Sequence, residues 1–114
     1  MDELNTDTEA AEPDPPVSVE VSAGADGSAL VAISGELDIS AVDALAQQVA
    51  PLLADCPPRL IVDVSGLRFA DSSAIALWVR WAGEVEDFEL RHPSPLLLRV
   101  IRGMGLAEKL GVTR

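Results

Sequence analysis

The chain of 114 residues is long enough for one domain with its own core, and 48% of its residues are apolar. Its net charge of −11 argues against sequence-independent binding to nucleic acid or to an anionic membrane surface, so neither partner is expected. It has one cysteine, no basic-then-apolar leader and no apolar run near the roughly 18 residues that span a bilayer, which predicts a cytoplasmic protein without an internal disulfide.

The first 16 residues differ in composition from the rest. They hold six acidic residues, three prolines and no basic residue. Such a segment buries too little apolar surface to offset the entropy of ordering, so residues 1–16 are expected to form a disordered acidic tail. All eight lysines and arginines lie at or beyond Arg59, and residues 17–114 are expected to fold as a single domain.

The domain begins with two predicted strands. Residues 17–22 alternate valine with polar residues, and residues 29–33 are apolar and partly β-branched. The turn formers at 24–27 between them predict a β-hairpin, with residues 35–38 closing the second strand. These two strands are therefore expected to be antiparallel neighbours.

An amphipathic helix is predicted after the hairpin. Its apolar residues recur at the i, i+3, i+4 and i+7 spacing of one helix face, at Val42, Leu45, Ala46 and Val49. Asp38 or Ser40 is expected to cap its start, because short polar side chains accept hydrogen bonds from the first backbone N–H groups. Pro51 is expected to end or kink it, since proline lacks the N–H that a helix interior needs.

A buried strand and a second helix are predicted next. Residues 60–64 form an apolar run typical of a central strand. Residues 65–66 predict a turn, with Leu67 and Phe69 filling the space beneath it. A largely apolar helix is expected to begin near Ser72 and to pack tightly against the sheet.

The last predicted elements are a strand and a third helix. Residues 88–91 alternate as in an edge strand, and Ser94 followed by Pro95 is a helix-start signal. Leu97 and Ile101 mark the buried face of that helix. The resulting order, ββαβαβα, predicts an α/β fold with a mixed four-stranded sheet and helices packed on it.

Catalytic chemistry finds little support in the sequence. A serine at a strand–turn–helix junction resembles the nucleophile elbow of hydrolases, but the flanking glycines are absent, and the single histidine, His92, is expected in a solvated loop. One histidine and one cysteine supply no metal-ligand cluster, and no glycine-rich phosphate loop follows a strand. We therefore expect a binding protein rather than an enzyme, without a metal or cofactor.

The most informative stretch is Asp71-Ser72-Ser73, at the predicted start of the second helix. A helix N-terminus carries unpaired backbone N–H groups and about half a positive charge, so a negative group on a residue there is locally stabilised. Aspartate and serine are also ordinary helix caps. The triplet by itself is therefore explained by capping alone.

Several stretches, taken together, resemble a known family. The order and spacing of the pieces match the anti-sigma factor antagonists, the bacterial members of the STAS domain family, over about residues 17–111. The pieces that carry the resemblance are residues 35–38, 60–64, 65–73 and 95–105. It implies a STAS-like α/β domain that binds a regulatory partner in transcription.

The resemblance implies a phosphorylation switch. In that family the first serine after the aspartate is phosphorylated by the anti-sigma factor, a serine kinase of the histidine-kinase-like ATPase type. The unphosphorylated antagonist binds this kinase and so frees a sigma factor. Carried over, Ser72 is the phosphorylation site, which a phosphatase would reset. The partner-binding face is then expected to comprise Glu36, Asp38, Arg68, Asp71 and Ser73.

Two other functions remain open for the same fold. One is a STAS subunit that docks on the ATPase of a lipid or solute transporter without being phosphorylated. The other is a sensor that binds a nucleotide or lipid between the first hairpin and the second helix. Two serines after Asp71 favour the switch, because a kinase needs a hydroxyl in reach whereas docking does not. The absence of a basic phosphate-binding set near Asp71 in the sequence weighs against the sensor.

Overall fold

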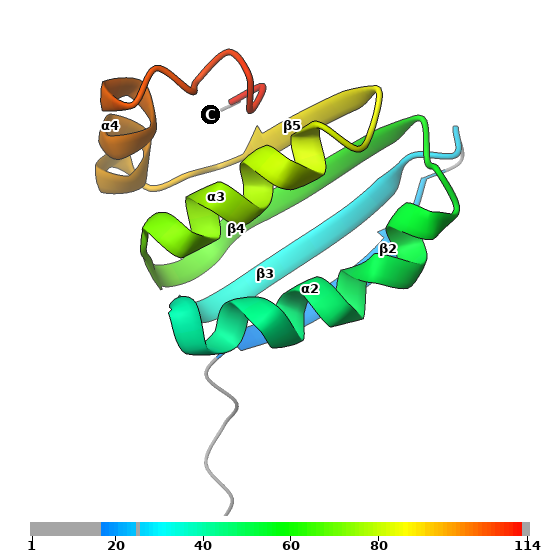
Figure 1. The fold of residues 1–114 in the computed structure, drawn as a ribbon, viewed down its shortest axis with the longest axis horizontal. Coiled ribbons are helices and arrows are strands. Elements are labelled where there is room, and N and C mark those ends of the chain that lie inside the picture. The colour runs from blue at the N-terminus through cyan, green and yellow to red at the C-terminus, as the bar shows by residue number, and fades with distance from the viewer. Residues whose placement is uncertain (1–16, 25, 113–114) are drawn as a thin grey trace, which may run out of the picture.

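The chain folds in the predicted order, ββαβαβα. The computed structural model describes residues 17–24 and 26–112, and the predicted tail at 1–16 lies outside them (Figure 1). Its elements are β2 (Val17–Ala23), β3 (Ala29–Leu37), α2 (Ile39–Ala54), β4 (Arg59–Ala70), α3 (Ser72–Ala82), β5 (Asp87–Arg91) and α4 (Pro95–Gly103). No helix among these residues is long and apolar enough to cross a membrane.

The four strands form one mixed sheet, as predicted, and their order in it is β2-β3-β4-β5. β2 and β3 are the antiparallel hairpin, whereas β3, β4 and β5 run parallel to one another. In the β3–β4 register, Leu37 pairs with Ala70, so both strands end at the same edge of the sheet. Helices α2 and α3 follow these two strands and therefore start side by side (Figure 1).

One apolar core lies between the sheet and its helices. Alternate residues of β3 are buried there, as the period of two along a strand requires, and β4 contributes Leu60, Val62 and Val64. Trp78 and Trp81 of α3 are 0% and 1% exposed, and Ile101 of α4 is 0% exposed. The cluster joins all three helices to the sheet, which fixes α3 in place between α2 and β5.

Both inner strands are longer than the sequence predicted. β4 runs through residues 65–66 to Ala70, so the turn expected there is wrong. Gly66 lies against Ser34 of β3, and its missing side chain lets the two backbones approach where the register shifts. The glycine therefore marks a close strand contact instead of a turn. Phe69 is 52% exposed and does not fill space beneath a turn, whereas Leu67 is half-buried against the core.

The helix starts follow the predicted caps, whereas Pro51, which was expected to end or kink α2, does not end it. Asp38 caps α2, and Ser94 caps α4 with Pro95 at the first helical position. α2 continues past Pro51 to Ala54. Proline in this last stretch removes one backbone hydrogen bond, and its ring is exposed, so Pro51 is tolerated where a buried interior proline would not be.

The close contact at Gly66 predicts a specific loss of stability. A Cβ added to Gly66 would lie 2.7 Å from the Cβ of Ser34. We expect Gly66→Ala to lower the free energy of unfolding by about 1–3 kcal/mol, because the strands must separate to accept the methyl group. Urea unfolding of the full chain measures this. In the matched control Gly103→Ala, the new Cβ meets nothing within 4 Å and unfolding should be unchanged or slightly harder. Equal losses in both variants would contradict the packing argument.

Candidate functional site

Two helices begin side by side with the same cap. Asp38 Oδ1 accepts hydrogen bonds from the Ser40 backbone N–H at 3.0 Å and from the Ser40 hydroxyl at 2.6 Å. Asp71 Oδ1 accepts the equivalent pair from Ser73, with the N–H at 3.0 Å. Each helix thus satisfies early N–H donors with an aspartate one residue before its start. The arrangement directs two helix N-termini toward one edge of the sheet.

Asp71 also connects the two helix starts. Its backbone N–H donates to the Leu37 carbonyl at 3.3 Å, which ties the start of α3 to the end of β3. Its carboxylate accepts hydrogen bonds from the Ser73 hydroxyl and backbone N–H. The nearby backbone N–H groups of Ala74 and of Ile39, which belongs to α2, also favour its charged form. These hydrogen bonds hold the pKa of the Asp71 carboxyl below its usual value, the Ser73 hydroxyl being the largest cause. Asp71 is therefore ionised at neutral pH.

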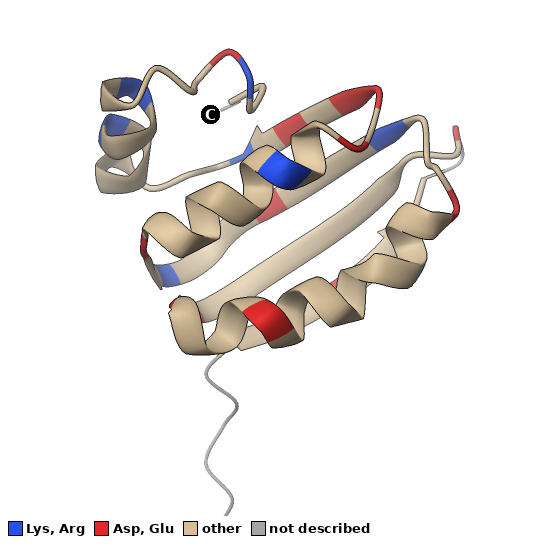
Figure 2. Ribbon diagram, viewed as in Figure 1, with Lys and Arg blue, Asp and Glu red and all other residues tan. Residues whose placement is uncertain are grey.

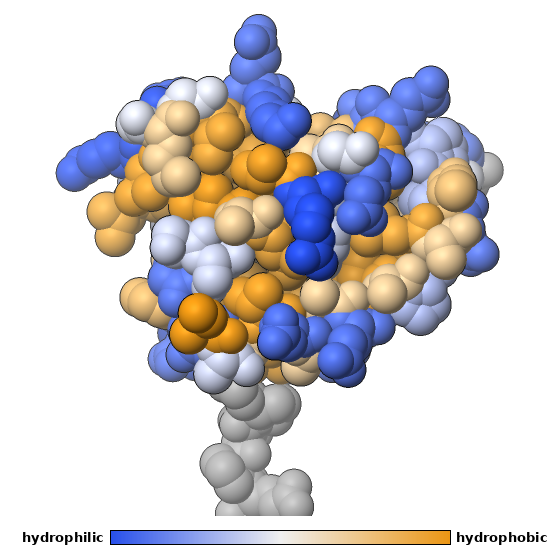
Figure 3. Space-filling model, viewed as in Figure 1, coloured by the Kyte–Doolittle hydropathy of each residue, from blue (hydrophilic) through white to orange (hydrophobic). Residues whose placement is uncertain are grey.

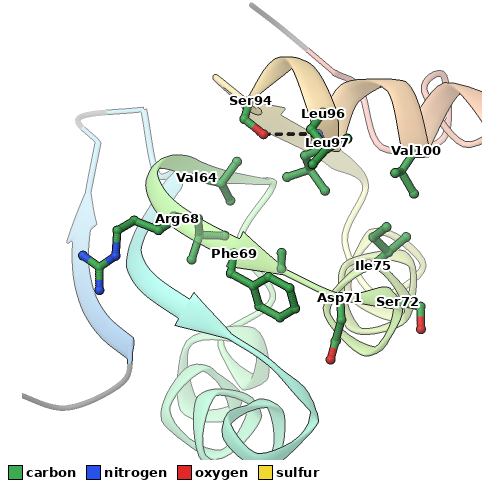
Figure 4. A pocket seen from close by; sticks show the side chains of 12 residues that line it. Val64, Arg68, Phe69, Asp71, Ser72, Ile75, Ser94, Leu96, Leu97 and Val100 are labelled. Atoms are coloured by element: carbon green, nitrogen blue, oxygen red, sulfur yellow. Dashed lines mark hydrogen bonds between the residues drawn. The ribbon is translucent and has the colours of Figure 1, made fainter.

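The two serines after Asp71 have different environments. Ser73 is half-buried and its hydroxyl donates to the Asp71 carboxylate. Ser72 is exposed on the first turn of α3, and its hydroxyl makes no hydrogen bond with any described residue. Figure 4 shows Asp71 and Ser72 at the start of α3, beside a pocket. Ser72 is thus the accessible hydroxyl of the pair.

The remaining predicted site residues lie on the strands that lead to this edge. Glu36 of β3 and Arg68 of β4 are exposed and form a long ion pair, with 3.9 Å between Arg68 Nη2 and Glu36 Oε2. The guanidinium of Arg68 points away from the pocket (Figure 4). The fold therefore places all six predicted residues near the ends of β3 and β4. Their roles in binding stay predictions.

The sequence did not reveal the pocket beside Ser72. It has a volume of about 350 Å³ and lies between the end of β4, the start of α3 and α4. Its apolar lining includes Phe69, Ile75, Leu96, Leu97 and Val100. The sequence of α4 does contain a signal for this pocket. Besides Leu97 and Ile101, which pack in the core, the helix carries the apolar residues Leu96 and Val100 that line the pocket.

Groups typical of catalysis do not gather at this edge in the described part of the chain. His92 lies on a loop, is 52% exposed and approaches Asp63, with 3.7 Å between Nδ1 and Oδ1. No cluster of three His, Cys, Asp or Glu residues that could hold a metal ion occurs among residues 17–24 and 26–112. What the edge offers is an exposed hydroxyl, fixed carboxylates and an apolar pocket.

Known proteins share this architecture. The family model described as "Mlab, STAS domain" matches residues 18–112. The structure of an anti-sigma factor antagonist from Mycobacterium paratuberculosis is 27% identical, with a TM-score of 0.78 over 89% of this chain and 87% of that one. No curated protein sequence matches the chain.

Two further solved structures share the fold. The anti-sigma factor antagonist SpoIIAA in its unphosphorylated form is 22% identical, with a TM-score of 0.72 over 85% of this chain and 89% of that one. The Bacillus cell fate determinant SpoIIAA in the phosphorylated form is also 22% identical, with a TM-score of 0.67 over 85% and 92%. Both likenesses concern the arrangement of strands and helices.

The lowered pKa of Asp71 predicts how acid affects stability. Because the folded-state pKa lies below the ordinary value of 3.8, ionised Asp71 stabilises the fold above that pH, and the contribution is lost as pH falls through the folded-state pKa. We expect Asp71→Asn to unfold at lower urea concentration than the parent at neutral pH, and the difference to shrink at acid pH. Asp43→Asn, at an exposed position of α2, is the control. A difference that is the same at both pH values would contradict this role of the charge.

Proposed function

The chain belongs to the STAS domain family, and on that premise we propose that it is an anti-sigma factor antagonist switched by phosphorylation of Ser72. Its unphosphorylated form binds an anti-sigma factor that is also a serine kinase, and this binding frees a sigma factor in the cytoplasm. The relative described as an anti-sigma factor antagonist, which matches over 89% of this chain, supports the class of partner. The protein acts by binding, without catalysis of its own.

One observation carries the proposal: the Ser72 hydroxyl is exposed, whereas the hydroxyl of the neighbouring Ser73 already donates a hydrogen bond to Asp71. A kinase must bring the attacking oxygen into line with the γ-phosphate. Ser72 can be presented without breaking any hydrogen bond of the fold. The Ser73 hydroxyl would first have to break its hydrogen bond to the Asp71 carboxylate, which is part of the network at the start of α3. Ser72 is therefore the residue that the kinase modifies.

A phosphate at Ser72 changes charge without refolding the domain. It adds about −1.5 to −2 charges at a helix N-terminus, where backbone N–H groups and the helix dipole favour an anion. It also adds them next to Asp71, on an edge that already carries Asp38 and Glu36. A partner that covers this edge must remove water from a neutral hydroxyl in one state and from a phosphate in the other, and the second costs far more free energy. Binding and release thus follow from one local charge.

Phosphorylation tests this directly. The full chain is co-expressed with each candidate serine-kinase anti-sigma factor of the same genome, and its intact mass is measured. We expect one added phosphate on the parent chain and on Ser73→Ala, and none on Ser72→Ala. Loss of the phosphate in Ser73→Ala alone would mean that the wrong hydroxyl was chosen. Absence of phosphate with every kinase, together with co-purification of a transporter ATPase, would favour the transporter-subunit function.

The charge at Ser72 should control affinity. We expect Ser72→Asp to weaken binding to the kinase about tenfold or more, which is about 1.4 kcal/mol or more, while Ser72→Ala retains binding. Titration calorimetry with the purified kinase measures both. Ser22→Asp is the matched control, because Ser22 is exposed on β2 and pairs with Leu30, at the other end of β3 from the site. Equal weakening by Ser22→Asp would mean that only the net charge of the domain matters.

A further inference from the structure

A second hollow lies on another side of α4. It has a volume of about 300 Å³, and its lining residues are Pro95, Leu98, Arg99 and Arg102. Leu98 is buried, whereas Pro95 and both arginines are exposed. The hollow is separate from the pocket beside Ser72, which α4 borders with other side chains. Figure 3 shows apolar surface between α4 and the start of α3, where that other pocket lies. The α4 hollow thus combines an apolar base with two cations.

The two arginines of the α4 hollow have no carboxylate beside them. Helix α4 contains no acidic residue, and Figure 2 shows only basic charge on it. The ion pairs among the described residues use other basic side chains, namely Arg59, Arg68, Arg91 and His92. Arg80 of α3 also lines a hollow, but Glu84 lines it too. Arg99 and Arg102 lie three positions apart and therefore on neighbouring parts of one helix face, where they attract an acidic segment.

The chain itself contains such a segment. Residues 1–16, which lie outside the described residues, hold six acidic side chains and no basic one. Within them, Leu4 is flanked by Asp2 and Glu3 on one side and by Asp7 on the other, whereas residues 8–16 have no large aliphatic or aromatic side chain. Residues 2–7 therefore offer carboxylates together with one apolar side chain, which complements the α4 hollow in charge and in apolar character.

The start of β2 brings this segment within reach of α4. Val17 pairs with Gly35 of β3, Gly35 pairs with Leu67 of β4, and Leu67 lines the pocket that α4 borders. Two strand spacings and one packed helix therefore place Val17 about 25 Å from the outer side of α4. The chain between Leu4 and Val17 can span up to about 43 Å when extended. The length of the tail thus permits contact without strain.

We propose that residues 2–7 of the chain bind the α4 hollow, with Leu4 over Leu98 and the flanking carboxylates on Arg99 and Arg102. Exposed ion pairs are individually weak, so a separate peptide with these groups would bind poorly. A tethered segment is present at an effective concentration in the millimolar range, at which weak contacts suffice. A second copy of the chain brings the same segment at a far lower concentration. The tethered tail is therefore the occupant, and another acidic protein reaches α4 only by displacing it.

This inference does not rest on the proposed function. Neither Arg99 nor Arg102 lines the pocket beside Ser72, and the contact requires no phosphate. Phosphorylation of Ser72 can fail while the tail binds α4, and the tail can fail to bind while Ser72 is phosphorylated. The two proposals are tested by different measurements.

Neutralisation of the tail in the full chain labelled with ¹⁵N tests the contact. The variant Asp2→Asn, Glu3→Gln, Asp7→Asn removes the carboxylates around Leu4. We expect it to shift the amide signals of residues 96–103, and 0.5 M salt to shift the same signals of the parent chain in the same direction, because salt screens exposed charges. The control Glu9→Gln, Glu12→Gln, Asp14→Asn removes the same number of charges and should leave these signals in place. Equal shifts in both variants, or none in the first, would overturn the proposal.

The reciprocal change locates the other half of the contact. We expect Arg99→Gln with Arg102→Gln to shift the amide signals of residues 2–7. Arg80→Gln with Lys109→Gln removes two other exposed cations and should leave them unchanged. If both pairs shift the tail signals equally, the tail follows the overall charge of the domain and has no site on α4, which contradicts the proposal.

Two further measurements identify any other occupant. Unlabelled parent chain is added in excess to the labelled chain whose carboxylates at 2, 3 and 7 are neutral. We expect no change, whereas return of the signals of residues 96–103 to their parent positions would assign the hollow to the tail of a second copy. If the tail variants move nothing but added polyglutamate shifts these signals, the hollow belongs to a separate acidic protein. Either result overturns the proposal.

Discussion

The parallel pairing of β3 with β4 is the constraint on which the rest of this structure depends. It brings Leu37 and Ala70 into register, so the two strands end together and the helices after them start together. Asp71 then reaches the backbone of both elements, through Leu37 of β3 and Ile39 of α2. Parallel strands need helical crossovers, and the shared edge of a parallel pair is where helix N-termini and loops meet.

At that edge, Asp71 and Ser73 cap the helix, whereas their neighbour Ser72 presents a hydroxyl to solvent. Asp71 and Ser73 hold the start of α3, and their hydrogen bonds are internal to the cap. Ser72 contributes nothing to the cap and remains exposed. A charge can therefore be added to Ser72 with little effect on the fold. Under the proposed function its effect on a partner that covers Ser72 is large, because a buried charge costs far more than a buried hydroxyl.

Helix α4 adds a surface that the core does not need. Leu97, Leu98 and Ile101 satisfy its packing, and Leu96 and Val100 are left on the side that faces Ser72. Exposed apolar surface of this kind lowers solubility when nothing covers it, and here it lies next to the accessible hydroxyl of Ser72.

The sequence by itself determined the element order, the caps and the family, whereas contacts between strands decided the rest. Caps such as Asp38 and Asp71 act on residues two positions away, so local spacing predicts them. The extension of β4 through Gly66, and with it the exposure of Phe69, depends on how closely β3 approaches, which no local pattern encodes. The pocket likewise joins β4, α3 and α4, segments far apart in the chain. The resemblance had already singled out Ser72, and the structure adds the physical difference: the Ser73 hydroxyl donates to Asp71, whereas Ser72 is exposed.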